Sequence, residues 1–198
     1  MSRRAVNSTK ACPMCKNFHN YQPSQAVQIQ AKTPQRLASL VQRMTRGQLK
    51  KRPQPGKWSV AEILHHLNDC EIVYGFRTRL ILAEQKPRLT PFDQNAWAAN
   101  LGYATSDPGL ALQSFVSVRR QNVAIMRRLT PEDWDRVGDH VEYGPITFRQ
   151  VIYHLTDHDQ NHLAQIARLR ERLLSKRPRG EGRAGMGPAR TGSRLRGG

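Results

Sequence analysis

A chain of 198 residues is long enough for one domain with a substantial core and too short for two full domains. The chain has 38% hydrophobic residues, and no apolar stretch approaches the ~20 residues of a membrane span. The N-terminal arginines are not followed by the apolar run of a secretory signal. These features argue against a membrane or secreted protein, so we expect a cytoplasmic one. The formal net charge of +17 gathers at the ends, since residues 1–20 hold four basic residues and no acid and residues 176–198 hold seven basic residues and one acid.

Residues 1–22 are expected to form a flexible basic leader. Cys12, Cys15 and His19 have the spacing of half a zinc site, but a closed structural site needs four ligands and no second CxxC lies nearby. A zinc knuckle therefore stays open as the alternative to a loose leader. The low, odd number of three cysteines suits a reducing compartment better than a disulfide scaffold.

A first helix is predicted over residues 33–49, where apolar residues recur at helical spacing. Thr33 is the expected N-cap, and Pro34 occupies the first helical position, where proline is tolerated. Residues 50–56 contain two prolines and a glycine and are expected to form a linker.

The second helix is predicted over residues 59–84. Ser59 and Glu62 have the spacing of a capping box, in which each side chain accepts a bond from the backbone of the other residue. The apolar stripe of this helix comprises Val60, Ile63, Leu64, Leu67, Cys70 and Tyr74.

Three polar residues of the second helix are distinguished by their position around its axis. At about 100° per residue, His66 borders the apolar face, whereas His65 points almost to the opposite side. His66 is therefore either a half-exposed boundary residue or a candidate metal ligand. Arg77 lies on the same side as His66 and is either a solvated surface residue or the holder of an anionic substrate group.

Residues 86–107 form a predicted crossover loop with a short helix near 95–100, of a length often used as a lid or a pocket wall. A third helix is predicted over 108–129, with Asp107 as its cap and a proline at its first position. A brief extended segment is expected within residues 136–145.

The fourth helix is predicted over residues 147–174, with Thr147 and Gln150 as its capping box. His158 and His162 lie on the middle of its apolar stripe, where a simple bundle helix would carry Leu or Ile. Two imidazoles one helical turn apart can direct nitrogens at a single point, so HxxxH is a half-site for zinc-like metals. The alternative is a pair of core histidines that are hydrogen-bonded to carbonyl groups.

Two neighbours of this pair are also of interest. Gln165 follows His162 by three residues and either orients a ligand or is a polar boundary residue. His154 lies at the edge of the stripe, where it could line a pocket without touching a metal.

These helices predict an all-α fold, an up-down four-helix bundle with a long crossover loop, over residues 23–175 and with little strand. Residues 176–198, rich in Gly, Pro and Arg, are expected to form a disordered basic tail. Metal sites in bundles form between facing helices, so His66 and the HxxxH pair are suitably placed to share one.

Three segments resemble the DinB/YfiT-like family of metal-binding four-helix proteins. They are GKWSVAEILHHLNDCE at 56–71, PFDQNAW at 91–97 and TFRQVIYHLTDHDQNHLAQI at 147–166. Their order and spacing match throughout, so the resemblance spans approximately residues 25–174. The basic ends, including Cys12 and Cys15, fall outside it.

The resemblance implies a DinB-like bundle with one divalent metal ion, Zn or Ni, held by His66, His158 and His162. His154 matches no family ligand. Three imidazole ligands would leave a coordination position for water, a thiol or a substrate oxygen. The implied activity is that of a metal-dependent hydrolase or a thiol S-transferase, with metal-bound water or thiol as the reacting group. The implied partner is a small-molecule substrate, with a low-molecular-weight thiol as co-substrate, and a homodimer stays open.

Two other classes of function compete with an enzyme. One is a non-enzymatic metal-stabilised bundle, and the other is an interaction module whose basic tails bind nucleic acid. The sequence has no RNP-like aromatic motif, zinc-finger pairing or helix-turn-helix, so specific nucleic-acid binding is not expected.

Overall fold

The computed structural model describes residues 20–175. Residues 1–19, with Cys12, Cys15 and His19, and the expected tail at 176–198 lie outside the described residues. The elements are, in chain order, α1 (Pro23–Val41), α2 (Arg46–Lys50), α3 (Val60–Ala83), β1 (Arg88–Leu89), α4 (Gln94–Asn100), α5 (Pro108–Met126), the 3-10 turn η1 (Asp133–Asp135), β2 (Val137–His140), β3 (Gly144–Thr147) and α6 (Phe148–Ser175).

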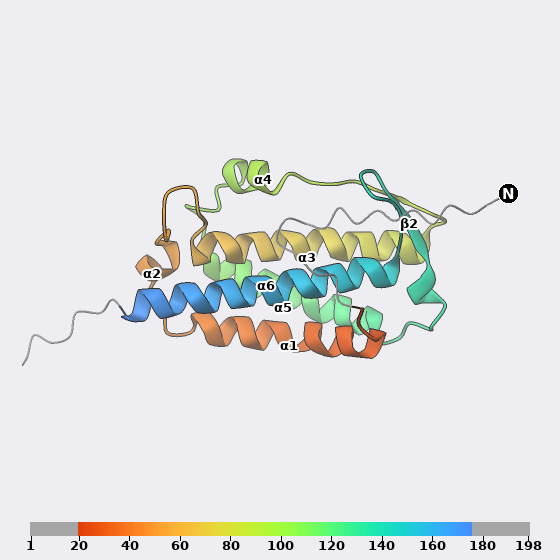
Figure 1. Cartoon of the computed structure of the whole chain (residues 1–198), viewed down its shortest axis with the longest axis horizontal. Helices are drawn as coiled ribbons and strands as arrows, with labels where there is room; N and C mark the ends of the chain where they lie inside the picture. The colour runs from red at the N-terminus through yellow and green to blue at the C-terminus, as the bar shows by residue number, and fades with distance from the viewer. Residues whose placement is uncertain (1–19, 176–198) are drawn as a thin grey trace, which may run out of the picture.

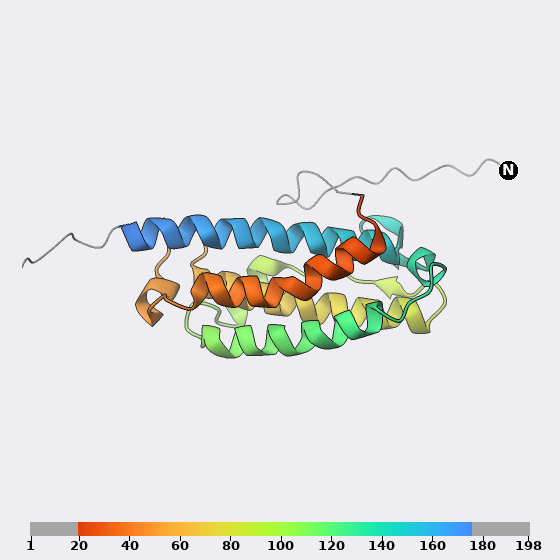
Figure 2. The same cartoon turned by 90° about the horizontal axis from the view of Figure 1, so that it is seen from below.

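The long helices α1, α3, α5 and α6 form a four-helix bundle, as expected (Figure 1). Both α1 and α3 pack against α5 and α6, so α1 and α3 stand diagonally across the bundle (Figure 2). The crossover after α3 returns the chain to the end where α3 began. As a result α3 and α5 run in one direction, and α1 and α6 run in the other (Figure 1).

The predicted starts of three helices are confirmed. Ser59 and Glu62 form the capping box of α3, and the Asp107 side chain accepts from the backbone N–H of Gly109 at the start of α5. Before α6, the backbone N–H groups of Thr147 and Gln150 each bond the side chain of the other residue. Side chains close in sequence satisfy the first N–H groups of these helices, so their starts follow from local chemistry.

The predicted first helix over 33–49 is wrong in both bounds. α1 begins ten residues earlier, at Pro23, and Pro34 lies inside it. The short α2 is a separate helix after a turn. Thr33 does not cap a helix start, because it lies inside α1. Its hydroxyl donates instead to the carbonyl of Ile29, one turn earlier in the same helix. Burial of Ala26 and Val27 extends the helix toward its N-terminus and outweighs the helix-breaking effect of proline.

The interior proline has a structural use. Pro34 has no N–H, so the carbonyl of Gln30 lacks its intrahelical donor. Nη1 of Arg119, on α5, donates to that carbonyl over 3.4 Å. Figure 2 shows α1 bending near its middle, as expected for a helix with an interior proline.

A small sheet closes one end of the bundle. The strand order is β1-β2-β3. β1 pairs with β2 in parallel, with Leu89 opposite His140, and β2 pairs with β3 antiparallel, with His140 opposite Gly144. The extended segment expected within 136–145 is therefore confirmed as parts of β2 and β3. Gly138 allows β2 to lie close to both β1 and α3, because a Cβ there would come within 2.6 Å of the Leu89 side chain and 3.1 Å of the Ile81 side chain. The sheet fixes His140 above the end of α3.

The core consists of two apolar clusters with buried polar side chains between them. One cluster contains Phe148, Ile152 and Leu155 of α6, and the other contains Leu163 and Ile166. The buried polar side chains at mid-bundle are Gln30 and Thr33 from α1, His66 and Glu71 from α3, Arg119 and Asn122 from α5, and Thr156, His158, Asp159 and His162 from α6. Within residues 20–175, none of the helices is both apolar and long enough to cross a bilayer.

Candidate metal centre

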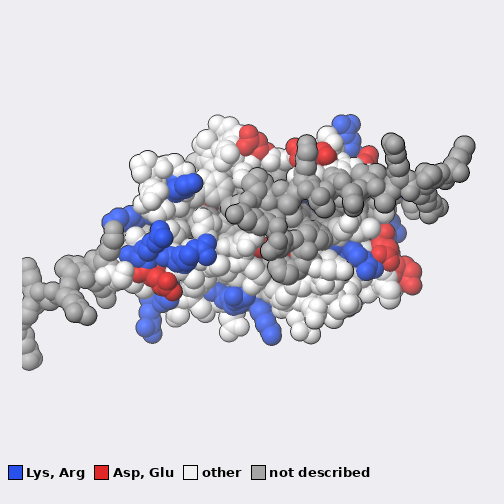
Figure 3. Space-filling view, viewed as in Figure 1, with Lys and Arg blue, Asp and Glu red and all other residues white. Residues whose placement is uncertain are grey.

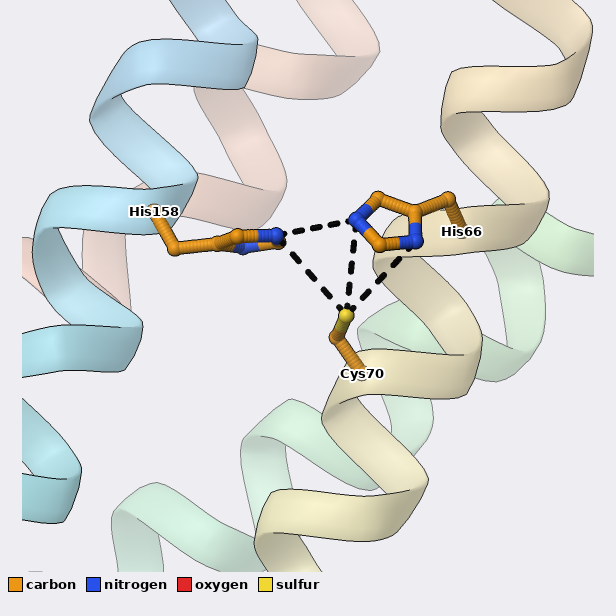
Figure 4. Close-up of side chains that lie close together, drawn as sticks. All are labelled: His66, Cys70 and His158. Carbon is orange, nitrogen blue, oxygen red and sulfur yellow. Dashed lines mark hydrogen bonds between the residues drawn. The ribbon is translucent and has the colours of Figure 1, made fainter. Parts of the chain in front are cut away.

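The three histidines selected from the sequence meet between α3 and α6. Their exposed fractions are 1% for His66, 5% for His158 and 0% for His162. The half-exposed alternative for His66 is therefore wrong. The Nε2 atoms of His66 and His158 lie 2.9 Å apart, and the two rings come from facing helices (Figure 4). The His162 ring centre lies 4.9 Å from that of His66 and 4.5 Å from that of His158.

Cys70 also belongs to this group. The sequence had placed Cys70 only in the apolar stripe of α3. Its Sγ lies 3.6 Å from Nε2 of His66 and 3.8 Å from Nε2 of His158 (Figure 4). Cys70 follows His66 by four residues, the same spacing that separates His158 from His162. That spacing was the signal in the sequence that could have identified Cys70 as a ligand. In the structure, His66, Cys70 and His158 together form a possible metal-binding group.

The distances between these donor atoms fit a transition-metal site. Bonds of about 2.0–2.1 Å to nitrogen and about 2.3 Å to sulfur place the donors of a tetrahedral zinc site roughly 3.3–3.6 Å apart. The observed separations of 2.9, 3.6 and 3.8 Å bracket that range. Imidazole and thiolate donors suit zinc and nickel better than magnesium or calcium, which prefer oxygen ligands.

The electrostatic surroundings keep His66 ready to bind a metal. Burial, and then the neighbouring His158 and His162, lower the pKa of His66 to about 2. The ring is therefore neutral at neutral pH, and a nitrogen lone pair is available without loss of a proton.

Two side chains of α6 fix the orientation of its histidines. Nδ1 of His162 lies 2.9 Å from Oε1 of Gln165. An amide oxygen only accepts, so Nδ1 carries the proton and Nε2 of His162 has the lone pair. Oδ1 of Asp159 lies 3.7 Å from Nδ1 of His158, which is too long for a hydrogen bond.

Asp159 is held in place by a buried arginine. Its other oxygen pairs with Nη2 of Arg119 over 2.7 Å, and the same nitrogen lies 2.5 Å from Glu71 on α3. Burial opposes ionisation of Asp159, but Arg119 and His158 outweigh it, so the pKa of Asp159 lies below its ordinary value. A carboxylate is thus maintained beside His158.

The other two helical histidines lie apart from the centre. His65 stacks against Tyr103, with ring centres 5.5 Å apart, on the side of α3 that the helical phase predicted. Nδ1 of His154 lies 2.6 Å from the Tyr74 hydroxyl. Both are partly buried, which makes them suitable controls for His66, His158 and His162.

Arg77 is 7% exposed, so the solvated surface alternative for this residue is wrong. Its Nη2 donates to the carbonyl of Thr90 over 2.6 Å and lies 3.4 Å from Nε2 of His140. Sequence analysis did not select His140, because a single histidine in a short extended segment has no distinguishing pattern.

Comparisons with known proteins identify the family of this chain. The family model of the DinB superfamily matches residues 31–166. The chain is 28% identical over 148 residues to the Bacillus subtilis protein named "Putative metal-dependent hydrolase YfiT", covering 74% of this chain and 83% of that one. It is 28% identical over 139 residues to the Oceanobacillus iheyensis protein named "Putative metal-dependent hydrolase OB0782", covering 70% of this chain and 80% of that one.

A solved structure shows the same fold. It is described as YfiT from Bacillus subtilis, a probable metal-dependent hydrolase with an unusual four-helix bundle topology. The superposition has a TM-score of 0.72 at 27% identity and covers 80% of this chain and 91% of the other.

Proposed function

Because this chain belongs to the DinB superfamily, we propose that it is a metal-dependent enzyme whose centre is formed by His66, His158 and His162, with Cys70 as a further donor. The observation that carries this proposal is the meeting of three buried imidazoles and a thiol at mid-bundle, between two apolar clusters. Buried polar groups without a role are costly, and a shared cation compensates for them.

A bound divalent metal would supply a Lewis acid that activates water or a thiol at neutral pH. The residues of this chain prepare the site for it. Gln165 holds the proton of His162 on Nδ1, and Asp159 lies beside Nδ1 of His158 and favours a proton there. Both contacts leave the lone pair on Nε2, and Nε2 of His158 lies 2.9 Å from Nε2 of His66.

The reaction class that we propose is hydrolysis or S-transfer to a low-molecular-weight thiol, on a small-molecule substrate. The names of the relatives support hydrolysis, and the family resemblance supports both. The donor set supports zinc or nickel as the metal. Trp58 forms part of the wall of the site, with its ring centre 4.9 Å from that of His66.

Metal content per chain tests the proposal. His66→Ala, His158→Ala and His162→Ala should each purify at neutral pH with metal affinity reduced by at least about tenfold, because the remaining donors cannot complete the site. His65→Ala and His154→Ala, which remove the same side chain from α3 and α6 outside the centre, should retain the metal. The proposal fails if the first three variants remain stoichiometric or if His65→Ala loses metal as completely as they do.

The same proteins test the role of Cys70 and the activity. The cobalt-loaded wild type should show a thiolate-to-metal absorption that Cys70→Ser abolishes, and its absence would reduce the donor set to three histidines. The zinc- or nickel-loaded protein should catalyse ester or amide hydrolysis or thiol transfer, and chelation should remove that activity. Full activity after chelation would reject the mechanism.

A further inference from the structure

A second group of buried polar side chains lies further along the interface between α3 and α6. Arg77 on α3 is 7% exposed and His140 on β2 is 4% exposed. Cζ of Arg77 lies 5.2 Å from the centre of the Tyr74 ring, and the Tyr74 hydroxyl bonds His154 of α6 over 2.6 Å. The proposed metal centre uses none of these four side chains.

His140 faces a hydrogen-bond donor at each of its ring nitrogens. The backbone N–H of Glu142 donates to Nδ1 over 3.2 Å, and Nη2 of Arg77 lies 3.4 Å from Nε2. Burial, and then Arg77, lower the pKa of His140, so its ring is neutral at neutral pH. A neutral imidazole has one acceptor nitrogen, and the shorter contact assigns it to Nδ1. Nε2–H of His140 therefore points at another donor.

The charge of Arg77 also lacks compensation. Its Nε is buried and has no hydrogen-bond partner. Within residues 20–175, no carboxylate forms an ion pair with this guanidinium. Asp139 and Glu142, the acidic residues that influence His140, are exposed on the sheet, and His154 and Arg77 oppose their effect. A buried guanidinium without a counter-charge is unfavourable.

We propose that Arg77 and His140 bind a small anionic group, either a carboxylate or a phosphate. One of its oxygens would accept from Nε2–H of His140 and from Nη2 of Arg77, which replaces the contact between two donors with two hydrogen bonds. The anion also supplies the missing negative charge, and the guanidinium fork matches both groups.

The position of this anion site defines a substrate class. Arg77 follows Cys70 by seven residues, which is about 10 Å along the axis of α3. Tyr74 and His154 lie between the two sites. In this proposal the anion site anchors one end of a substrate, and the metal centre lies about 10 Å from it along α3. This role as an anchor rests on the proposed function, whereas anion binding itself does not require a metal.

Titration of the metal-free full-length protein with inorganic phosphate and, separately, with acetate tests the site. The readout is the chemical shift of the His140 ring, because other basic residues of this +17 chain also attract anions without affecting that ring. At least one anion should shift the His140 resonances saturably. Arg77→Gln should weaken that binding by about 10- to 100-fold, as expected for loss of a charged hydrogen bond.

The control is Arg120→Gln, which removes the same charge from an exposed position of α5 and should leave binding unchanged. Arg77→Lys keeps the charge without the fork and should weaken binding less than Arg77→Gln does. It also serves as the deciding variant if Arg77→Gln does not fold. The proposal is overturned if neither anion shifts His140, or if the folded Arg77 variants bind as the wild type does.

A third variant separates this site from the metal centre. His158→Ala should lose the metal and still bind the anion with wild-type affinity. If the wild type binds the anion but no metal, the proposed function fails while the anion site stands. The opposite result is a wild type that binds metal while Arg77 serves only to connect Thr90 and His140 to α3. Phosphate and acetate then leave the chemical shifts of the His140 ring unchanged, and the anion site is refuted.

Discussion

Arg119 is the residue on which the buried polar layer of the bundle depends. It is fully buried, pairs with Glu71 and Asp159, and donates to the carbonyl that Pro34 leaves without an intrahelical donor. Asn122 adds a hydrogen bond to Glu71 over 2.7 Å. Burial raises the pKa of Glu71 in spite of Arg119, which shows how strongly this environment disfavours charge.

Replacing Arg119 should therefore be severely destabilising. Arg119→Met leaves two carboxylates, both at most 1% exposed, without a cation, and we expect a loss of about 3–5 kcal/mol in unfolding free energy measured with urea. Adding Glu71→Gln should recover part of the loss, because one buried negative charge disappears. Arg120→Met, exposed and adjacent, is the control. A loss below about 1 kcal/mol would contradict this account of the polar layer.

At the scale of elements, the parallel helices α3 and α5 share the most extensive contact among the described elements, and a glycine permits their close packing. A Cβ on Gly75 would lie 2.6 Å from Nδ2 of Asn122. The Asn122 side chain cannot easily move, because it also bonds Glu71 and accepts from Arg79. This contact couples the spacing of α3 and α5 to the buried polar layer.

Gly75→Ala should lower the unfolding free energy by about 1–3 kcal/mol through overpacking, in spite of the helix preference of alanine. Gly47→Ala in α2 is the matched control, since its added Cβ meets only the Thr45 side chain at 4.0 Å. That control should be neutral or stabilising by up to about 1 kcal/mol. Thermal or urea unfolding measures both, and equal effects of the two substitutions would argue against the close packing.

At the scale of the whole molecule, the metal centre makes stability depend on pH. The pKa of His66 is lowered to about 2 in the folded chain, mainly by burial, and an unfolded histidine titrates near about 6.5. Below that pH the unfolded chain binds a proton that the folded chain does not. The stability of the metal-free protein should therefore be complete above about pH 6.5 and fall as the pH decreases.

Urea unfolding of the chelated protein between about pH 7 and pH 5 measures this dependence, and His66 should contribute up to about 1.4 kcal/mol per pH unit. His66→Gln removes the titrating ring, so the difference between wild type and variant isolates this residue from the buried carboxylates. An identical pH dependence in both proteins would show that His66 is not buried in a neutral form.

Local chemistry in the sequence determined the starts of α3, α5 and α6 and the faces of the helices that carry the histidines. Ser59, Asp107 and Thr147 cap their helices through side chains within three residues, and the helical period alone placed His158 and His162 in the core. The same period placed His66 at the border of its apolar face. These features depend on neighbours in the chain and are readable without the fold.

Only the tertiary structure decided which side chains meet across helices. Cys70 has the pattern of an apolar stripe residue, and its role depends on the approach of α6 to α3. Arg77 and His140 are 63 residues apart and are joined by the sheet. Pro34 stays within α1 because burial against the rest of the bundle outweighs its local preference. Such pairings arise from packing energy between distant segments, which no local pattern contains.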